Sequence, residues 1–223
     1  MQNNLISNRR IVTLLALIVA GEAIFFLPFL LARVFRPTVL EVFGLSNLQL
    51  GSAYGVYGTV AMAAYIFGGP LADRFAARKM LAIALLSTAA GGILLLTIPK
   101  LSTLIILYGY WGITTIALFW APLIRATREW GGELSQGVAF GLLDGGRGLL
   151  AAITASIMVV LFAAFLPANL DSADLTQRTA ALRQIILLLL VITTATALLI
   201  WWALASQPIE STADLKVNSQ KTL

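Results

Sequence analysis

A short basic segment, residues 69–79, lies between two long runs without a charged side chain, 50–68 and 80–99. Each run is about as long as the roughly 20 apolar residues that an α-helix needs to cross a bilayer. Basic residues that join two such runs are typical of a loop on the cytoplasmic side of a membrane. The pattern therefore predicts two membrane helices that meet at that face. Gly69 and Pro70 are expected to end the first of them, because proline lacks the N–H that continues a helix.

The composition of the whole chain agrees with a membrane protein. Of its 223 residues, 59% are hydrophobic and 11% are charged, whereas soluble domains carry about 25% charged residues. The chain has too few polar residues to cover a water-soluble core, so lipid is its expected solvent. The net charge of +5 does not indicate nucleic acid as a partner, because the basic residues stand at the ends of apolar runs.

The residue types that are missing exclude several functions. The chain contains no Cys and no His. This excludes disulfides, thiolate metal sites, catalytic triads that use histidine, and histidine proton relays. The remaining acids and hydroxyls form no metal-ligand spacing and no nucleophile with a base, so an enzyme, a metal site and a cofactor are not expected.

Apolar segments predict six transmembrane helices, at about 11–32, 48–68, 79–98, 103–124, 137–166 and 184–205. Polar segments join them, including a predicted cytoplasmic loop at 125–136 and an outer loop at 167–183. Nine Lys and Arg residues fall on the side that holds both termini, and five fall on the other side. The positive-inside rule therefore favours cytoplasmic termini. The expected fold is an all-α, multi-pass bundle in the plasma membrane, or in the inner membrane of a bacterium.

The basic segment resembles the signature between the second and third helices of the major facilitator superfamily. That signature begins with Gly, three residues, Asp and a basic residue, and it ends in a basic pair. Five residues match: Gly69, Asp73, Arg74, Arg78 and Lys79. The family usually has a glycine before the basic pair, where this chain has alanine, and alanine would be strained if that turn needed a positive φ. The alternative is an ordinary basic cytoplasmic loop.

The resemblance implies a secondary active transporter that lacks half of the usual fold. The family has two six-helix halves, each made of two inverted three-helix repeats, with substrate bound between the halves. This chain matches one half, a bundle of residues 1–205 with repeats at about 11–98 and 103–205, followed by a linker-like cytoplasmic tail at 206–223. The implied partner is a second six-helix half, from a separate chain or a second copy; otherwise the chain is a truncated product.

Glu22 lies about halfway along the first predicted helix. An ionised side chain at that depth costs about 3 kcal/mol or more, so such residues usually face a cavity and carry function. In the resembling family, acids of the first helix often bind and release the coupling proton, which makes Glu22 a proton-coupling candidate. The alternative is a structural acid that pairs with an arginine.

Asp144 and Arg147 are three residues apart on the fifth predicted helix, so they share one face. Gly137, Gly141 and Gly145 repeat every four residues there and form a ridge on which another helix can pack closely. Arg147 is a substrate-binding candidate because a guanidinium holds a carboxylate or phosphate with two hydrogen bonds. Asp144 is a second proton-coupling candidate. The alternative is an internal pair of the two residues.

This glycine-rich stretch also resembles the fifth helix of the organophosphate and organic-anion branch of the family. That resemblance implies a symporter, or an exchanger, for a small organic anion or a sugar-like solute, coupled to protons. Arg33 and Arg36, near the outer end of the first helix, are expected either to attract anions in an outer vestibule or to reach the headgroups. Tyr57 and Trp111 are expected either to contact substrate or to pack in the core.

The resemblance further implies a gate at the cytoplasmic face. There Asp73 would pair with Arg125 or Arg128 at the inner end of the fourth helix, and would face a helix N-terminus of the other half. The expected partners are therefore the lipid bilayer, a small-molecule substrate, protons and a second half. The alternative function is that of a non-transporting membrane subunit, or of an inactive fragment of a transporter.

Overall fold

A computed structural model describes residues 2–132, 135–167 and 173–204 of the chain, with side chains from residue 9 onward. Every regular element of these residues is helical, and six helical spans are long and apolar enough to cross a membrane. The spans are Arg9–Val34, Asn47–Arg74, Ala77–Thr97, Leu101–Gly131, Gln136–Ala164 and Leu175–Ala203. The six predicted membrane helices and the all-α fold class are thereby confirmed. The predicted tail at 206–223 lies outside the described residues.

Several spans are built from more than one helical piece. The first comprises α1 (Gln2–Ala23), a π-helical stretch η1 (Phe26–Leu30) and α2 (Leu31–Val34), and the short helix α3 (Arg36–Phe43) follows it. The third span comprises α5 (Ala77–Gly92) and the 3₁₀ stretch η2 (Ile93–Thr97). The fourth comprises α6 (Leu101–Gly112), the π-helical η3 (Ile113–Trp120) and α7 (Ala121–Gly131). The second, fifth and sixth spans are single helices, namely α4 (Asn47–Arg74), α8 (Gln136–Ala164) and α9 (Leu175–Ala203).

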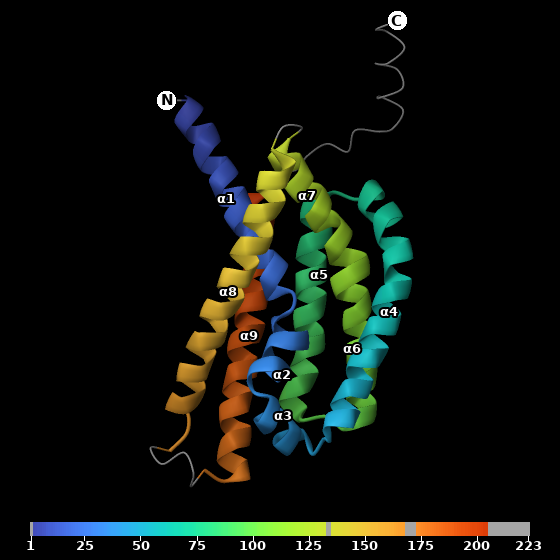
Figure 1. Cartoon of the computed structure of the whole chain (residues 1–223), viewed down its shortest axis with the longest axis vertical. Helices are drawn as coiled ribbons and strands as arrows, with labels where there is room; N and C mark the ends of the chain where they lie inside the picture. The colour runs from blue at the N-terminus through green and yellow to red at the C-terminus, as the bar shows by residue number, and fades with distance from the viewer. Residues whose placement is uncertain (1, 133–134, 168–172, 205–223) are drawn as a thin grey trace, which may run out of the picture.

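The spans form an upright bundle in which α8 and α4 lie at opposite flanks of the view in Figure 1, with α2, α5 and α7 between them. α1 packs against α8 and α9, α5 packs against α9, and α4 packs against α6 and η3. α1 begins at the same end of the bundle at which α9 ends (Figure 1). The placement of this end in the cytoplasm stays a prediction, and it is named the predicted cytoplasmic end below.

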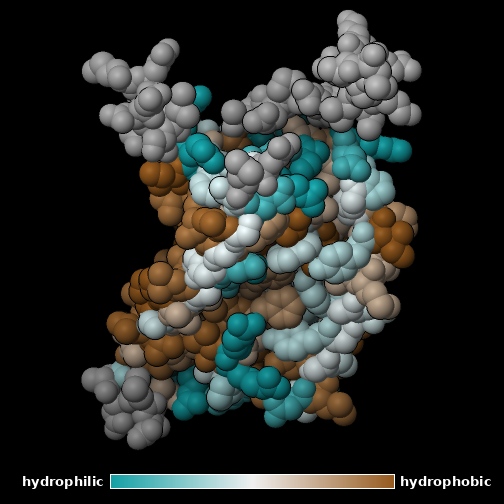
Figure 2. Space-filling view, turned by 45° about the horizontal axis from the view of Figure 1, so that its top comes forward, coloured by the Kyte–Doolittle hydropathy of each residue, from teal (hydrophilic) through white to brown (hydrophobic). Residues whose placement is uncertain are grey.

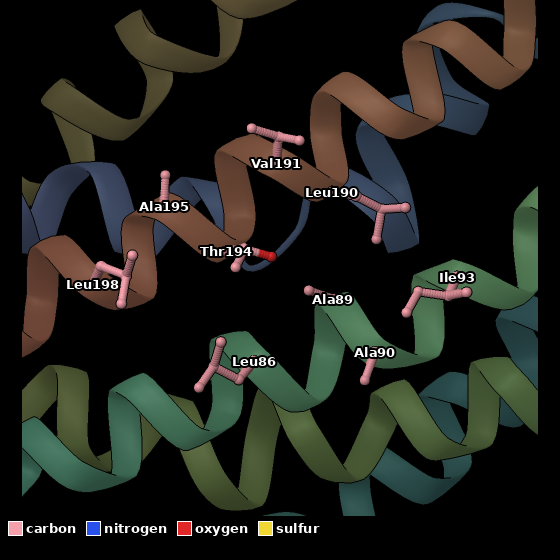
Figure 3. Close-up of a pocket in the computed structure, with 9 residues that line it drawn as sticks. All are labelled: Leu86, Ala89, Ala90, Ile93, Leu190, Val191, Thr194, Ala195 and Leu198. Carbon is pink, nitrogen blue, oxygen red and sulfur yellow. The ribbon is translucent and has the colours of Figure 1, made fainter.

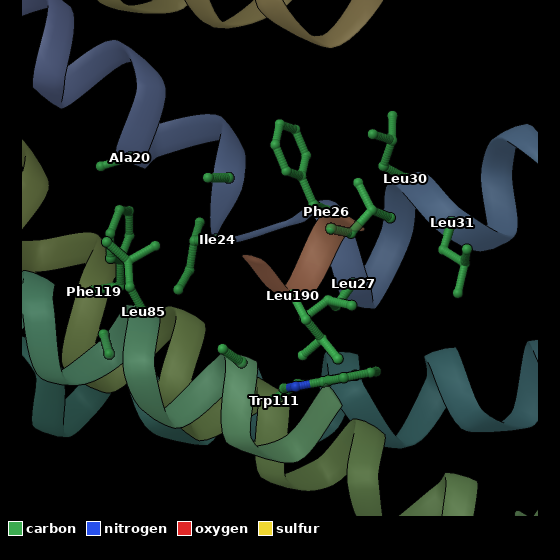
Figure 4. Close-up of a cluster of buried hydrophobic side chains, with 14 of the residues drawn as sticks. Ala20, Ile24, Phe26, Leu27, Leu30, Leu31, Leu85, Trp111, Phe119 and Leu190 are labelled. Carbon is green, nitrogen blue, oxygen red and sulfur yellow. The ribbon is translucent and has the colours of Figure 1, made fainter. Parts of the chain in front are cut away.

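The core is apolar and closely packed. Trp111, Phe26 and Phe119 are its largest fully buried side chains, and Figure 4 shows them together with side chains from α1, η1, α5 and α9. A Cβ atom built on Gly92 would lie 2.6 Å from Leu27 Cδ1, which is closer than real contacts allow. Glycine at that position therefore lets α5 approach η1 closely.

Pro28 interrupts the first span in its second half. Proline has no backbone N–H and its ring crowds the preceding turn, so helices bend or break beside it. The N–H of Phe25 donates to the carbonyl of Glu22 at 3.0 Å, rather than to that of Gly21, four residues back, as a regular α-helix requires. The break therefore leaves the Gly21 carbonyl available to another donor.

The prediction that Gly69 and Pro70 end a helix was wrong, because α4 continues through Pro70 to Arg74. Both residues are exposed near the end of the helix, where water or headgroups can satisfy the carbonyl that Pro70 cannot bond. The connection to α5 is therefore short. Its backbone needs no glycine at the position before the basic pair, because Ala77 is the first residue of α5 and Ile98 is the only non-glycine residue with a positive φ among the described residues.

Two other segments that were predicted as loops are partly helical. Residues 125–131 belong to α7, which begins at Ala121 and carries Pro122 in its first turn, where proline is tolerated. Residues 175–183 belong to α9. Asp174 and Gln177 form a capping box there: the Gln177 N–H donates to Asp174 Oδ1 at 2.7 Å, and the Asp174 N–H donates to Gln177 Oε1 at 3.0 Å. Such caps satisfy free N–H groups, so the helix starts earlier than hydropathy alone indicates.

α8 and α4 are the least covered spans. Only 11% of an apolar 18-residue stretch of α8 and 22% of one in α4 is buried, against 44% to 61% for such stretches of the other spans. Several of their glycines have nothing within 4 Å of an added Cβ atom, namely Gly137, Gly141, Gly145 and Gly148 of α8 and Gly51, Gly55 and Gly58 of α4. Each helix thus presents a smooth, uncovered ridge.

Candidate functional site

Arg147 of α8 lies at the centre of a polar cluster near the middle of the bundle. Its Nε donates to the Gly21 carbonyl at 2.9 Å and lies 3.7 Å from Glu22 Oε2. Its Nη1 donates to Asp144 Oδ1 at 3.2 Å. The side chains of Arg147 and Glu22 are 18% and 12% exposed, whereas that of Asp144 is 70% exposed. One guanidinium therefore contacts both a partly buried acid on α1 and an exposed acid on α8.

The break in the first span and the glycines around it make this contact possible. The Gly21 carbonyl accepts from Arg147 because the N–H of Phe25 bonds elsewhere. A Cβ atom on Gly21 would lie 2.8 Å from Arg147 Cδ, and one on Gly146 would lie 2.7 Å from Ile18 Cδ1. Both glycines are therefore required for the close approach of α1 and α8 at this level.

Aromatic rings cover the guanidinium and extend away from it. Arg147 Cζ lies 5.4 Å from the ring centroid of Trp120 and 5.8 Å from that of Phe25, distances at which a cation is attracted to a ring face. Phe25 contacts Phe29 at 6.1 Å between centroids, and Phe29 contacts Tyr57 at 4.7 Å. Tyr54 also contacts Phe29, at 5.5 Å between centroids. The five aromatic residues are named the aromatic wall below: Phe25, Phe29, Tyr54, Tyr57 and Trp120.

The aromatic wall is only partly buried. All five of its rings are intermediate in exposure, like Glu22 and Arg147. The Tyr57 hydroxyl shares a hydrogen bond of 2.8 Å with the Thr115 hydroxyl of η3, which fixes the ring between α4 and η3. Figure 2 shows hydrophilic atoms at mid-height of the molecule as well as at its ends, between apolar surfaces. The polar cluster and the aromatic wall together combine a cation, two acids and several ring faces.

The structure does not bring the other substrate candidates to this cluster. Arg33 and Arg36 are exposed at the outer end of the first span, where Arg36 Nε donates to Asn47 Oδ1 at 3.0 Å. Trp111 is fully buried, and its Nε1 donates to the Thr88 carbonyl at 3.1 Å. Its position in the core agrees with the packing alternative and not with contact to substrate.

The expected ion pair of Asp73 is not formed. Among the ion pairs of the described residues, none includes Asp73 or Arg128, and both side chains are exposed. Arg125 instead donates to the backbone carbonyls of Ala72 and Phe75, on either side of Asp73, and pairs with Glu129 at 3.2 Å. Arg125 thus connects α7 to the end of α4 by hydrogen bonds to backbone carbonyls.

The other motif residues line the predicted cytoplasmic end. Gly69, Arg74 and Lys79 are exposed. Arg78 Cζ lies 4.3 Å from the ring centroid of Trp201 at the end of α9. The motif residues therefore contact neighbouring helices through Arg125 and Arg78, while Asp73 points to an open surface.

Sequence reasoning missed the Gly21 carbonyl, Phe25 and Trp120 as neighbours of Arg147. One signal was available, because Pro28 stands inside the first apolar run and marks a break in the helix. It also missed a contact at the predicted cytoplasmic end, where Trp130 Nε1 donates to the Arg10 carbonyl at 2.7 Å and Arg10 Nη2 donates to the Trp130 carbonyl at 2.9 Å. Nothing in the local spacing indicates that pair, which joins positions 120 residues apart.

Six helices long and apolar enough to cross a membrane, with a charged cluster near the middle of two of them, define a multi-pass helical membrane protein. The chain belongs to the Major Facilitator Superfamily, whose sequence model matches residues 11–220. Members of this family are transporters.

Several curated proteins are similar to the chain. It is 30% identical over 167 residues to "Inner membrane protein YqcE" of Escherichia coli (strain K12), an alignment that covers 75% of this chain and 39% of the relative. It is 27% identical over 149 residues to "Inner membrane protein YihN" of the same organism, covering 67% and 35%. It is 28% identical over 164 residues to "Uncharacterized protein MG294 homolog" of Mycoplasma pneumoniae, covering 68% and 34%. The chain thus spans at most 39% of the length of these relatives. No solved structure matches it.

Proposed function

We propose that the chain forms one half of a secondary active transporter that moves a small organic anion together with protons. The observation that carries this proposal is the position of Arg147, a cation near mid-membrane that contacts two carboxylates. Charged side chains at this depth are costly and usually mark the path of a substrate or an ion. A guanidinium binds carboxylates and phosphates with well-defined geometry, so an anion is the substrate class that fits it.

The charges of the cluster supply a route to coupling. With both acids ionised, Glu22, Asp144 and Arg147 carry one surplus negative charge, which repels an anion. Uptake of one proton by Glu22 removes that surplus charge. It also ends the ion pair between the Glu22 carboxylate and Nε of Arg147. A substrate anion can then replace the carboxylate that Arg147 has lost. Proton and anion binding therefore favour each other, as co-transport requires.

The aromatic wall favours a substrate that carries a ring or another flat apolar face beside its anionic group. Binding sites for small molecules are lined mainly by apolar and aromatic side chains, with a few polar groups that fix orientation. Phe29 and Tyr57 extend the site away from Arg147, and both are accessible. A sugar acid or a sugar phosphate has both features, in agreement with the organic-anion branch suggested by the glycine-rich stretch.

A second six-helix unit is the proposed partner. The glycine ridges of α8 and α4 are uncovered, and glycine-rich surfaces let membrane helices pack closely. A unit that covers both ridges would also enclose the face on which Glu22 and Arg147 are accessible. In this arrangement the exposed Asp73 would contact the second unit at the predicted cytoplasmic end, and the two three-helix repeats would form one wall of the site.

The inner membrane is the proposed location, because two similar proteins are named as inner membrane proteins. A non-transporting membrane subunit is the second candidate function. It would use the same uncovered ridges to assemble, but it would not need the charged cluster at mid-membrane. The behaviour of Glu22 therefore discriminates between the two functions.

The test is uptake into vesicles that contain the chain in its native assembly. Radiolabelled glucuronate and glucose 6-phosphate serve as the first probes, with a pH gradient as the driving force. The proposal expects accumulation that collapses when the gradient is dissipated. In Glu22→Gln, gradient-driven accumulation should be lost, while exchange of anion against anion at equal pH continues. Accumulation by Glu22→Gln at the level of the unaltered chain would reject the coupling role.

A further inference from the structure

A lateral groove runs between α5 and α9 on the outside of the bundle. Its volume is about 520 Å³. Nine residues line it: Leu86, Ala89, Ala90, Ile93, Leu190, Val191, Thr194, Ala195 and Leu198. Figure 3 shows Thr194 and Leu190 of α9 directed toward α5, and Ala89 and Leu86 of α5 directed toward α9. All but Thr194 are apolar, and none of the nine belongs to the polar cluster or the aromatic wall.

We propose that this groove binds one acyl chain of an anionic phospholipid whose headgroup is held by Arg78 and Lys79 at the predicted cytoplasmic end. The groove lies between two membrane spans, and its surface is open to the surroundings of the bundle. Whatever fills it must be apolar. The proposal goes beyond the transport function and does not depend on it.

Basic and aromatic side chains stand at the end of the groove that a headgroup would occupy. Lys79 is exposed, and the guanidinium of Arg78 lies over the Trp201 ring at 4.3 Å. Trp202 is 74% exposed, as expected for a tryptophan at the level of the headgroups. The N-cap residue of α5 is Ala76, which offers no side-chain cap. The positive end of the helix dipole and two cations therefore converge where a phosphate would lie.

The dimensions agree with a lipid in one leaflet. Leu86 and Ile93 are seven and fourteen residues beyond Lys79 along the same span. At 1.5 Å of rise per residue, the groove lies about 10 to 20 Å from Lys79. One leaflet with its headgroups is about 20 Å thick. An acyl chain whose headgroup lies at Lys79 therefore reaches the whole groove.

The shape of the groove favours an acyl chain over a second helix. Its floor is formed by the buried Ala89 and Leu190, whereas large exposed side chains stand at its rims, with Ile93 57%, Val191 65% and Leu198 67% exposed. A helix with side chains is about 10 Å wide, and these rims keep such a cylinder away from the floor. A flexible hydrocarbon chain enters between them.

The test measures how the full chain holds two spin-labelled lipids in phosphatidylcholine vesicles. Spin-labelled phosphatidylglycerol should be immobilised in preference to spin-labelled phosphatidylcholine. Lys79→Gln should lower this preference about five-fold, the factor that corresponds to about 1 kcal/mol for one basic residue near the surface. Arg9→Gln, an exposed arginine at the same end on α1, is the matched control and should lower it much less.

A second variant tests the groove itself. Thr194→Phe places a ring where Thr194 is directed toward α5 (Figure 3) and should remove the immobilised phosphatidylglycerol. Ile106→Phe, at a position 72% exposed on α6, controls for added bulk and should retain it. Equal immobilisation of the two lipids, or retention by Thr194→Phe, would overturn the proposal. A change of native mass in Thr194→Phe would also overturn it, because a second protein chain would then be the occupant.

Discussion

The guanidinium Nε of Arg147 on α8 donates to the backbone carbonyl of Gly21 on α1 at 2.9 Å. The two residues are 126 positions apart, and the acceptor is free because the first span is broken immediately after it. A defect in one helix thus positions a charged side chain of another near mid-membrane. This relationship links the fold to the proposed chemistry.

Gly21→Ala should displace Arg147. The added Cβ would lie 2.8 Å from Arg147 Cδ and 3.3 Å from Leu123 Cδ2, so the guanidinium must move away from the carbonyl. Overpacking of this kind costs about 1–3 kcal/mol. We expect a lower midpoint of thermal unfolding in detergent. The control is Gly145→Ala, which meets open space and should be neutral or slightly stabilising. Equal midpoints for the two variants would show that the contact is not tight.

Arg147 and Glu22 should show strong energetic coupling. Arg147→Met leaves the Glu22 carboxylate, which is 12% exposed, without its cation. Breaking a buried pair by removing one partner costs about 3–5 kcal/mol, whereas removing both charges costs less. The double variant Arg147→Met with Glu22→Gln should therefore be more stable than Arg147→Met alone. Additive losses in the double-mutant cycle, measured by unfolding in detergent, would contradict a direct interaction.

Arg125 should matter more for the stability of the isolated chain than Asp73. Arg125 donates to two backbone carbonyls at the end of α4, whereas Asp73 is exposed and in no ion pair among the described residues. Arg125→Gln should lower the unfolding midpoint, and Arg128→Gln, an exposed neighbour on α7, should leave it nearly unchanged. Asp73→Asn should also leave it unchanged and act only in an assembly with a second unit. A large loss of stability in Asp73→Asn would require a contact within the chain.

The six spans could be predicted from the sequence because apolar runs of membrane length have few alternatives in a bilayer. The ends of the helices could not, since Pro70 lies inside α4 and the capping box at Asp174 starts α9 early. For the polar cluster, the sequence suggested two separate pairs as alternatives. One was Asp144 with Arg147, and the other was Glu22 with an arginine that the sequence did not identify. Arg147 contacts both acids at once. Spacing reveals the pair on one helix, but the contact of Arg147 with Gly21 on α1 joins residues 126 positions apart, which no local pattern encodes.

The ridge of α8 should be required for assembly and not for folding of the chain. Gly145→Leu adds a large side chain where nothing lies within 4 Å, so the unfolding midpoint should change little. Association with a second six-helix unit should weaken, because close packing depends on small side chains. Native mass in mild detergent measures this, and Ile106→Leu on α6 serves as the control. If the assembly forms equally well with Gly145→Leu, the partner does not cover α8.

Pro28→Ala should stabilise the chain and impair transport. Alanine restores an N–H to the first span and removes the ring that crowds the preceding turn, a change worth up to about 3 kcal/mol in a helix interior. A straighter span would let the N–H of Phe25 return to the Gly21 carbonyl, in competition with Arg147. We therefore expect a higher unfolding midpoint together with slower gradient-driven uptake. The opposite result, faster or unchanged uptake in a stabilised variant, would mean that the break has no part in positioning Arg147.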